Sequence, residues 1–360
     1  ALNVNLDASL DLFVDILLTP AFPEAQLSRV KSNWQDRIAQ EESTPSSIAL
    51  RRLPPILYGA DHPYGIPFTG SGYQTTVASI ERSDLLAFHE AHFSVDNATL
   101  MIVGATSEND IKPLLEKHLG AWKNFSPAAD TLQAADLLPV TIDTIPLEAK
   151  PPASKAVIYL IDKPGSPQSL ILGGQLLPAT AWPDTYKLDM ASDILGGSFT
   201  SRINMNLRED KGWAYGARTI TIDALGARPL LYYAPVQSDK TAESLRELLR
   251  EASEYGGVNP PNEAELSRFK SSFIRSLPGK FETNGAVLGA LAEIVEFNRP
   301  LDYLTVSQQQ VSSLTIADLL PVINEQIHPE QTIWLVVGDL ETIEPAVRAA
   351  NIAPVIVLEE

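Results

Sequence analysis

Residues 77–104 read VASIERSDLLAFHEAHFSVDNATLMIVG, and residues 311–338 read VSSLTIADLLPVINEQIHPEQTIWLVVG. The two stretches align without a gap at an offset of 234 positions. A second pair, AQLSRVKSNW from Ala25 and AELSRFKSSF from Ala264, aligns at an offset of 239. A loop insertion near GGVNPPNE accounts for the difference of five residues. We therefore interpret the chain as the product of an internal duplication.

The size of the offset sets the extent of each copy. Two complete copies of about 230 residues do not fit into this length, so we expect about 80–100 residues of the first copy to be missing before Ala1. The sequence predicts a partial first domain over residues 1–123, a linker over 124–153 and a complete second domain over 154–360. The linker segment carries five prolines, several acids and no strong periodicity, which is typical of a connecting segment.

Hydrophobic periodicity gives the expected elements of both parts. In the first part it predicts one buried strand at 98–103 and helices over residues 7–18, 24–41 and 46–58. Ser83 is the expected N-cap of a further helix, because serine is favoured at that position. In the second part it predicts strands over 155–161, 169–175, 213–222 and 230–236, and helices over 184–195, 198–208, 241–253 and 262–277. Strands and helices do not alternate strictly, so the pattern favours an α+β fold, in which helices pack on a largely antiparallel sheet, over a doubly wound parallel sheet.

Composition excludes several classes of function. A formal net charge of −18 argues against nucleic acid and anionic lipid as partners, because both require a basic surface. The chain has no cysteine, which excludes disulfides, thiolate nucleophiles and Cys-ligated zinc. No run of about 18 uncharged apolar residues occurs, so no membrane span is expected.

The segment 195–219, LGGSFTSRINMNLREDKGWAYGART, holds the residues best suited to chemistry. Gly196-Gly197 allow a sharp turn into the helix predicted over 198–208. Arg208 lies at the end of that helix, and Tyr215 follows it by seven residues on the next strand. A guanidinium and a phenol displayed together at such a corner can both donate hydrogen bonds to a carbonyl or an oxyanion.

A purely structural interpretation of the same residues stays open at this point. Arg208 would then pair with Glu209 or Asp210 at the surface, and Tyr215 would be half-buried. In either case the helix is expected to bury one apolar face, formed by Phe199, Ile203 and Leu207.

The same segment resembles the second-half signature of the pitrilysin/insulinase-type zinc metallopeptidases, the inverzincins. The strings TPAFPE, LYGADHPYG, FSVDNATLMIVG, DKPGSPQS, FETNGA and LVVGD also occur in that family's order, so the resemblance covers nearly all of the chain. In the family an Arg and a Tyr seven residues apart lie opposite the zinc and bind the substrate near the scissile bond. The resemblance therefore implies that Arg208 and Tyr215 bind substrate.

The family's zinc motif, H-x-x-E-H, does not occur in these 360 residues. The nearest string, His89-Glu90-Ala91-His92, has the wrong length and the wrong place for Glu. The family's third ligand, a Glu after the FPE-type turn, corresponds here to Gln35-Asp36, which suggests that even an intact first copy was not a working zinc domain. By the register of the repeat, the helix that would carry the motif lies before Ala1. We expect no cofactor on this chain, and zinc in a complementary half or subunit.

The resemblance implies the substrate-binding, non-zinc half of a peptidase that holds peptides or unfolded polypeptides in a clamshell chamber and is inactive alone. Two alternatives stay open: a catalytically inactive scaffold or assembly subunit of the same family, and a fragment of an intact two-domain zinc peptidase. The expected partners are the polypeptide substrate and a complementary H-x-x-E-H half, with no nucleic acid. Related bacterial members are often exported, so the resemblance implies a periplasmic or secreted protein.

Overall fold

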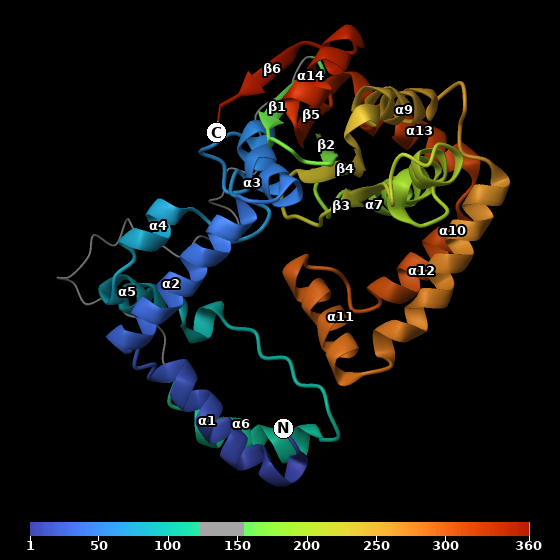
Figure 1. Ribbon diagram of the computed structural model, residues 1–360. Coiled ribbons are helices and arrows are strands. Elements are labelled where there is room, and N and C mark those ends of the chain that lie inside the picture. The colour runs from blue at the N-terminus through green and yellow to red at the C-terminus, as the bar shows by residue number, and fades with distance from the viewer. Residues whose placement is uncertain (123–154, 360) are drawn as a thin grey trace. The chain divides into compact units, whose positions relative to one another are not determined.

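The computed structural model describes residues 1–122 and 155–359 (Figure 1). The described residues divide into two compact units. The first unit holds residues 1–38, 73–122 and 279–293, and the second holds residues 39–72, 155–278 and 294–359. The predicted linker, 124–153, lies outside the described residues, and the domain boundaries at its two ends stay a prediction.

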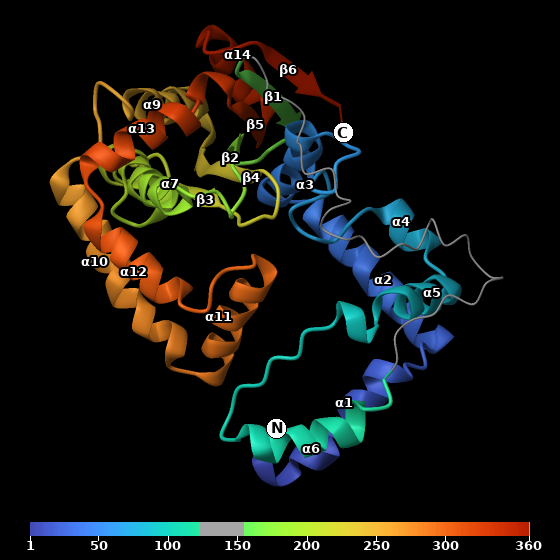
Figure 2. The ribbon, with the colours of Figure 1, turned by 180° about the vertical axis from the view of Figure 1, so that it is seen from behind.

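The regular elements among the described residues of the first unit are all helices. Its elements are η1 (Asn3–Asn5), α1 (Leu6–Leu18), α2 (Glu24–Glu41, through Ile38), α4 (Gln74–Ser79), α5 (Arg82–His92), η2 (Val95–Asn97), α6 (Glu108–Leu119) and most of α11 (Asn284–Glu296). Lys117 and His118 of α6 each place a nitrogen 2.7 Å from a carboxylate oxygen of Asp7 in α1. These two helices lie side by side in both views (Figures 1 and 2). The helices predicted at 7–18 and 24–41 are confirmed.

Two predictions in the first unit are wrong. The helix after residue 80 begins at Arg82 with Glu81 as its N-cap, not Ser83, and Asp84 completes a capping box with Glu81. The segment 98–103 is not a strand, although its apolar run matches one. A strand must pair with another strand, and no strand lies among the described residues of this unit.

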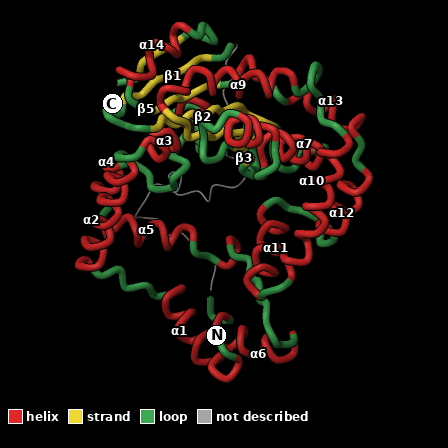
Figure 3. Tube along the Cα trace, turned by 45° about the vertical axis from the view of Figure 1, so that its right-hand side comes forward, coloured by secondary structure: helices red, strands yellow, loops and turns green. Residues whose placement is uncertain are grey.

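A six-stranded mixed sheet forms the centre of the second unit, in the order β3-β4-β2-β5-β1-β6 (Figure 3). Its strands are β1 (Val157–Asp162), β2 (Gln168–Leu177), β3 (Arg218–Thr221), β4 (Arg228–Gln237), β5 (Ile333–Gly338) and β6 (Val355–Leu358). The pairs β3–β4, β4–β2 and β2–β5 are antiparallel, whereas β1 runs parallel to both β5 and β6. The α+β class is therefore confirmed, with a sheet that is mixed rather than largely antiparallel.

Helices cover both faces of this sheet. The remaining elements of the unit are α3 (Pro45–Tyr58), α7 (Thr185–Ser192), η4 (Asp193–Gly197), α8 (Arg202–Asn204), η5 (Met205–Asp210), η6 (Ser238–Lys240), α9 (Thr241–Glu254), α10 (Glu263–Ser276), η7 (Leu277–Phe281, through Pro278), α12 (Tyr303–Ser313), α13 (Ile316–Gln326), η8 (Pro329–Gln331) and α14 (Leu340–Ala349). No helix in the described ranges combines the length and apolar character needed to cross a bilayer.

The central strand β5 contributes to two separate cores because its side chains alternate between faces. Trp334 and Val336 belong to the large core under α7, α9, α10, α13 and α14. Leu335 and Val337 belong to a smaller core on the other face, which α3 covers with Leu53. Helix α3 was predicted at 46–58, within the predicted first domain, yet it packs on the sheet of the second unit.

The strands β1, β2 and β4 lie where the sequence predicts them, β5 and β6 were not predicted, and two elements differ at the candidate site. The helix predicted over 198–208 begins only at Arg202 and continues as the π-helix η5. The strand predicted over 213–222 is restricted to β3, and upstream of it Ala214 makes one isolated bridge to Val236. Apart from that bridge, residues 211–217 lie outside the sheet, and they form the corner between η5 and β3.

Several elements recur in register along the chain. Helix α5 matches α13 at both ends at the offset of 234, and both carry a capping box. The short helices η2 and η8 match at the same offset. At the offset of 239, α2 and α10 begin at equivalent residues. At that offset Thr44 accepts a hydrogen bond from the Ser47 N–H, and Thr283 accepts one from the equivalent Ala286 N–H.

Candidate functional site

A tightly packed turn positions the start of the candidate site. Helix α7 continues into the π-helix η4, which ends at Gly197. A Cβ atom on Gly196 would lie 2.3 Å from the backbone nitrogen of Thr219 in β3, so only glycine fits there. This close approach fixes the end of η4 against β3. π-Helical turns of this kind occur frequently at functional sites.

A second turn returns the chain to Arg208. Gly212 follows the π-helix η5 with a φ of +66°, a left-handed conformation that glycine adopts without a steric cost. The Leu207 carbonyl then accepts hydrogen bonds from the N–H groups of Trp213 and Ala214, at 2.9 and 3.3 Å. This reversal places Tyr215 beside the helix that carries Arg208.

Arg208 lies between two aromatic rings. Its guanidinium carbon is 4.3 Å from the ring centroid of Phe199 and 5.3 Å from that of Tyr215, within the range of a cation–π contact. Tyr215 is 85% exposed and Phe199 is 59% exposed. The arrangement restrains a guanidinium at the surface and leaves its edge and the phenol open to a ligand.

The polar groups of this cluster keep donors for such a ligand. Arg208 Nε lies 3.5 Å from a carboxylate oxygen of Glu209, which is a longer contact than a well-formed charge-assisted hydrogen bond. Within the described part of the chain, the Tyr215 hydroxyl makes no hydrogen bond. Both side chains can therefore donate to one acceptor placed between them.

Asn204 ties the two aromatic segments together. Its Nδ2 donates to the Phe199 carbonyl at 2.6 Å, and its Oδ1 accepts from the Ala217 N–H at 3.0 Å. The Asn204 side chain is buried, so these hydrogen bonds are protected from water. One amide thus couples the loop before α8 to the corner that carries Tyr215.

The prediction that Phe199 lies on the apolar face of the helix is wrong. Ile203 and Leu207 are buried as expected, but Phe199 is exposed and forms part of the Arg208 cluster. The helix begins only at Arg202, so Phe199 does not share its apolar face. The neighbouring Ser198, Thr200 and Ser201 are typical of the region before a helix and were the signal that could have placed Phe199 outside it. Tyr215 is also more exposed than the half-buried side chain of the structural interpretation.

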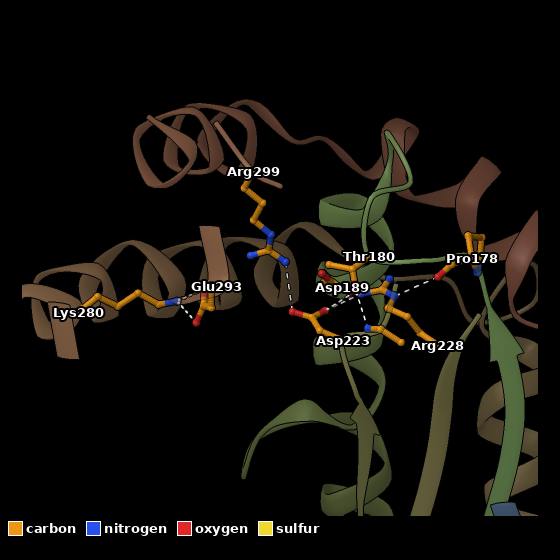
Figure 4. Close-up of polar contacts among 9 residues, drawn as sticks. Pro178, Thr180, Asp189, Asp223, Arg228, Lys280, Glu293 and Arg299 are labelled. Carbon is orange, nitrogen blue, oxygen red and sulfur yellow. Dashed lines mark hydrogen bonds and ion pairs between the residues drawn. The ribbon is translucent and has the colours of Figure 1, made fainter. Parts of the chain in front are cut away.

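An ion-pair cluster around one fully buried arginine supports α7, the helix that leads into the site (Figure 4). Arg228 is fully buried, and its Nη1 donates to Asp189 at 2.9 Å and to Asp223 at 3.3 Å. Its Nε donates to the Pro178 carbonyl at 3.1 Å, and Arg299 approaches the second oxygen of Asp223 to 3.2 Å. These contacts fix the start of β4 against α7.

The carboxyl groups of Asp189, in this cluster, and of Asp193, in η4, both have raised pKa values. Burial raises the pKa of Asp189, and the positive charge of Arg228 opposes that effect. Burial, and then the charge of Asp189, raise the pKa of Asp193 in η4 from 3.8 to about 6. Asp193 is exposed to solvent, so solvent screening weakens the effect of this shift on stability.

The residues present do not fit a zinc ion. Among the described residues, no three His, Asp or Glu side chains converge as metal ligands. His89 Nε2 lies 2.7 Å from the Leu17 carbonyl, and its ring stacks on Phe93. His92 packs on Phe88 instead. The position that matches the family's third ligand, Asp36, is exposed on α2.

Comparison with known proteins identifies the family. A family model described as the peptidase M16 inactive domain matches residues 79–273, more than half of the chain. The chain belongs to this family. The predicted resemblance to the zinc metallopeptidases is thereby confirmed, and the matched region includes Arg208 and Tyr215.

Curated relatives of this M16 chain are described as uncharacterized zinc proteases. YmxG of Bacillus subtilis is 24% identical over 290 residues, which cover 79% of this chain and 65% of YmxG. A protein of Rickettsia felis is 23% identical over 276 residues, covering 77% of this chain and 61% of its own length. The chain thus spans less than two thirds of the length of these relatives.

Solved structures share the fold of the M16 chain. The peptidase M16 inactive domain from Pseudomonas fluorescens superposes with a TM-score of 0.78 at 22% identity, covering 99% of this chain and 78% of that one. A protease from Helicobacter pylori gives a TM-score of 0.79 at 22% identity, covering 93% and 77%. At this identity the likeness supports the fold alone.

Proposed function

We propose that this M16 chain is the substrate-binding, non-zinc half of a zinc metallopeptidase that cleaves peptides or unfolded polypeptides between two halves of a clamshell. The observation that carries the proposal is the exposed Arg208–Tyr215 pair. Two donors are restrained side by side on a surface, and neither is consumed by a strong contact in the described structure. Such a pair suits a backbone carbonyl that develops negative charge.

Each side chain has a distinct role in this proposal. Arg208 donates to a substrate carbonyl and so orients the peptide near the scissile bond. Tyr215 donates its hydroxyl proton in a hydrogen bond to the oxyanion that forms as the carbonyl carbon is attacked. Phe199 restrains the guanidinium between two rings, so less side-chain entropy is lost when substrate binds.

The zinc and the general base belong to a complementary half in this proposal. The described residues of this chain do not fit the metal, whereas its curated relatives are described as zinc proteases and are longer. A family match to an inactive domain is consistent with a division of labour between two halves. A periplasmic or secreted location stays a prediction.

We further propose that the chain consists of one partial and one complete copy of the same domain, as the repeat predicts. The element bounds support this proposal, because α5 and α13 agree at both ends and carry the same capping box. The two helix caps at Thr44 and Thr283 agree at the offset of 239.

Reconstitution tests the proposed function. The 360-residue chain is assayed on unfolded casein alone, with added zinc, and with an M16 half that carries H-x-x-E-H. We expect cleavage only with the added half, and loss of that cleavage in 1,10-phenanthroline. Cleavage by the chain alone would contradict the proposal. A complex that forms without cleaving would favour the scaffold alternative, and an H-x-x-E-H about 75 residues upstream of Asp36 in the gene would favour the intact two-domain enzyme.

A further inference from the structure

Arg202 begins α8, directly after the loop 198–201, and its side chain is only 9% exposed. Its Nε and Nη2 donate to the two carboxylate oxygens of Glu265, at 2.7 and 2.6 Å. Nη2 also donates to the Pro260 carbonyl at 2.7 Å, and Nη1 donates to the Asn259 carbonyl. A guanidinium that is held by a bidentate carboxylate and two carbonyls has little freedom to move.

Arg202 also packs on an aromatic ring that is itself fixed. Its guanidinium carbon lies 5.1 Å from the ring centroid of Tyr255, within the range of a cation–π contact. Tyr255 is fully buried, and its hydroxyl donates to the Ala191 carbonyl of α7 at 2.8 Å. The cation is therefore held both by hydrogen bonds and by a ring that is tied to α7.

Helix α10 holds the loop 198–201 at a second point. Glu265 lies in the first turn of this helix, where it also accepts a hydrogen bond from the Asn262 N–H at 2.9 Å and completes a capping box. One turn later, Arg268 Nη1 donates to the Thr200 carbonyl at 3.1 Å. Helix α10 buries two of its residues in the large core. The loop is thus attached to a helix that the core keeps in place.

These contacts surround the backbone of Phe199, whose ring lies 4.3 Å from the Arg208 guanidinium carbon. The Phe199 carbonyl accepts from Asn204, the next carbonyl accepts from Arg268, and Arg202 follows three residues after Phe199. The ring itself is 59% exposed, so core packing does not fix it. Its position over Arg208 therefore depends on the backbone contacts of the loop.

We propose that Arg202 and Glu265 are positioning residues of the substrate site. Their ion pair fixes the loop 198–201 on α10, and the fixed loop holds Phe199 over the guanidinium of Arg208. Both residues act through Phe199, and neither side chain contacts the substrate. This inference rests on the proposed function, because it names what orients the guanidinium that binds the substrate carbonyl.

Stability alone does not account for this ion pair. Taking both charges out of water is costly, and replacing a buried ion pair by uncharged residues is often neutral or stabilising. The pair is better suited to fixing geometry, because a bidentate contact between a guanidinium and a carboxylate admits few orientations. The acceptors of Arg202 lie on α10 and at residues 259–260, so one side chain joins three segments of the chain.

A fluorine probe reports the position of the ring without a peptidase assay. In the 360-residue chain, 4-fluorophenylalanine replaces Phe199, and fluorine NMR measures its chemical shift. We expect a single line that moves when Arg208→Ala removes the cation beside the ring. Arg202→Met should move the line toward its position in the urea-unfolded chain, because the loop is released from α10. Arg268→Ala should move it in the same direction by less, and this exposed residue can be changed without risk to the fold.

Two controls separate positioning from stability. Arg51→Met removes a similarly buried cation of the same unit, which donates to Glu41 at 2.9 Å and to the Gly72 carbonyl at 2.8 Å. It should lower the Tm and leave the fluorine line unchanged. Arg202→Met combined with Glu265→Gln removes the unpaired carboxylate and keeps a residue suited to the capping box. This double variant should recover the Tm that Arg202→Met loses, while the fluorine line stays displaced.

The reconstituted peptidase gives a second readout. Arg202→Met should raise KM about two- to fivefold with little change in kcat, as loss of one exposed cation–π contact does. Adding Phe199→Ala to that variant should raise KM no further, because two residues that act through one contact are not additive. Arg208→Ala tests the proposed function separately. If it leaves the rate unchanged, the substrate role of Arg208 is wrong, while the fluorine line still decides the positioning role.

Two results would overturn the inference. The first is a fluorine line that Arg202→Met leaves at its position in the unchanged chain. The second is a double variant, Arg202→Met with Glu265→Gln, in which KM and the fluorine line recover together with the Tm, because the ion pair would then act on stability alone.

Discussion

The guanidinium carbon of Arg208 lies 5.3 Å from the ring centroid of Tyr215. Seven residues separate the two in the sequence, and a π-helix followed by a left-handed Gly212 brings them together. Both side chains reach solvent, and the ring restrains the cation without neutralising it. This arrangement supports the proposed role of the pair in binding substrate.

The second ring of the cluster gives the first prediction. Phe199→Ala removes the closer cation–π contact of Arg208 and should raise the KM of the reconstituted peptidase about two- to fivefold, since such a contact contributes about 0.5–1 kcal/mol at an exposed site. Phe199→Tyr keeps an aromatic face and should retain most of the affinity. Initial rates at several substrate concentrations separate KM from kcat. Equal loss in both variants would argue against a role for the ring.

Asn204 should matter for both stability and catalysis. Asn204→Ala leaves the Ala217 N–H and the Phe199 carbonyl without their partner, and an unsatisfied buried group costs about 1–3 kcal/mol. Asn204→Asp keeps an acceptor for the Ala217 N–H and should lose less. Urea denaturation gives the free energy of unfolding for each variant. An alanine variant as stable as the unchanged chain would show that these hydrogen bonds are not important for the corner.

Asp193 should make stability depend on pH. Its pKa is raised from 3.8 to about 6 in the folded chain, so the folded state holds the proton more strongly than the unfolded state does. Stability from this group is present below about pH 4 and is lost as the pH rises through about 6. Asp193→Asn should therefore stabilise the chain at pH 7 by about 1 kcal/mol, a figure discounted because the residue contacts solvent.

Below pH 4 the same variant should have almost no effect. Urea denaturation of both proteins at the two pH values measures the difference. A gain that is equal at both pH values would mean that packing, not ionisation, determines the effect.

The Arg228 ion-pair cluster should be sensitive to loss of its fully buried cation. Arg228→Met leaves Asp189 and Asp223, each 41% exposed, without that partner, which should lower the free energy of unfolding by about 1–3 kcal/mol. Lys280→Met is the control, because Lys280 and Glu293 form an exposed pair at 3.1 Å (Figure 4) and such pairs contribute about 0–1 kcal/mol. Similar losses in thermal unfolding for the two variants would contradict this account.

Local patterns predicted much of the fold because they act within one element. The long helix α2 was predicted with both of its ends, and the continuous apolar run LLYYAPV predicted β4 to within two residues at its start and one at its end. The Arg208–Tyr215 pair was also predicted from its spacing and context. These features depend on residues that are close in sequence.

Non-local partners account for what the sequence did not predict. Residues 98–103 have the composition of a strand, but a strand forms only where neighbours supply hydrogen bonds. The repeat indicated where α3 belongs in the sequence and gave no information on which sheet it covers. Phe199 joined the site because its helix begins at Arg202, and helix ends are the least certain feature of a periodic pattern.

The most direct test of the proposed substrate site is the effect of Arg208→Ala and Tyr215→Phe on the rate of the reconstituted peptidase. Removing one preorganised donor to an oxyanion costs about 10²–10³ in kcat, so Tyr215→Phe should lower kcat by about that factor. Arg208→Ala should lower kcat/KM at least tenfold, and both variants should bind the zinc-carrying half normally. If the reconstituted rate is unchanged in both variants while the complex still forms, the assignment of the site is wrong.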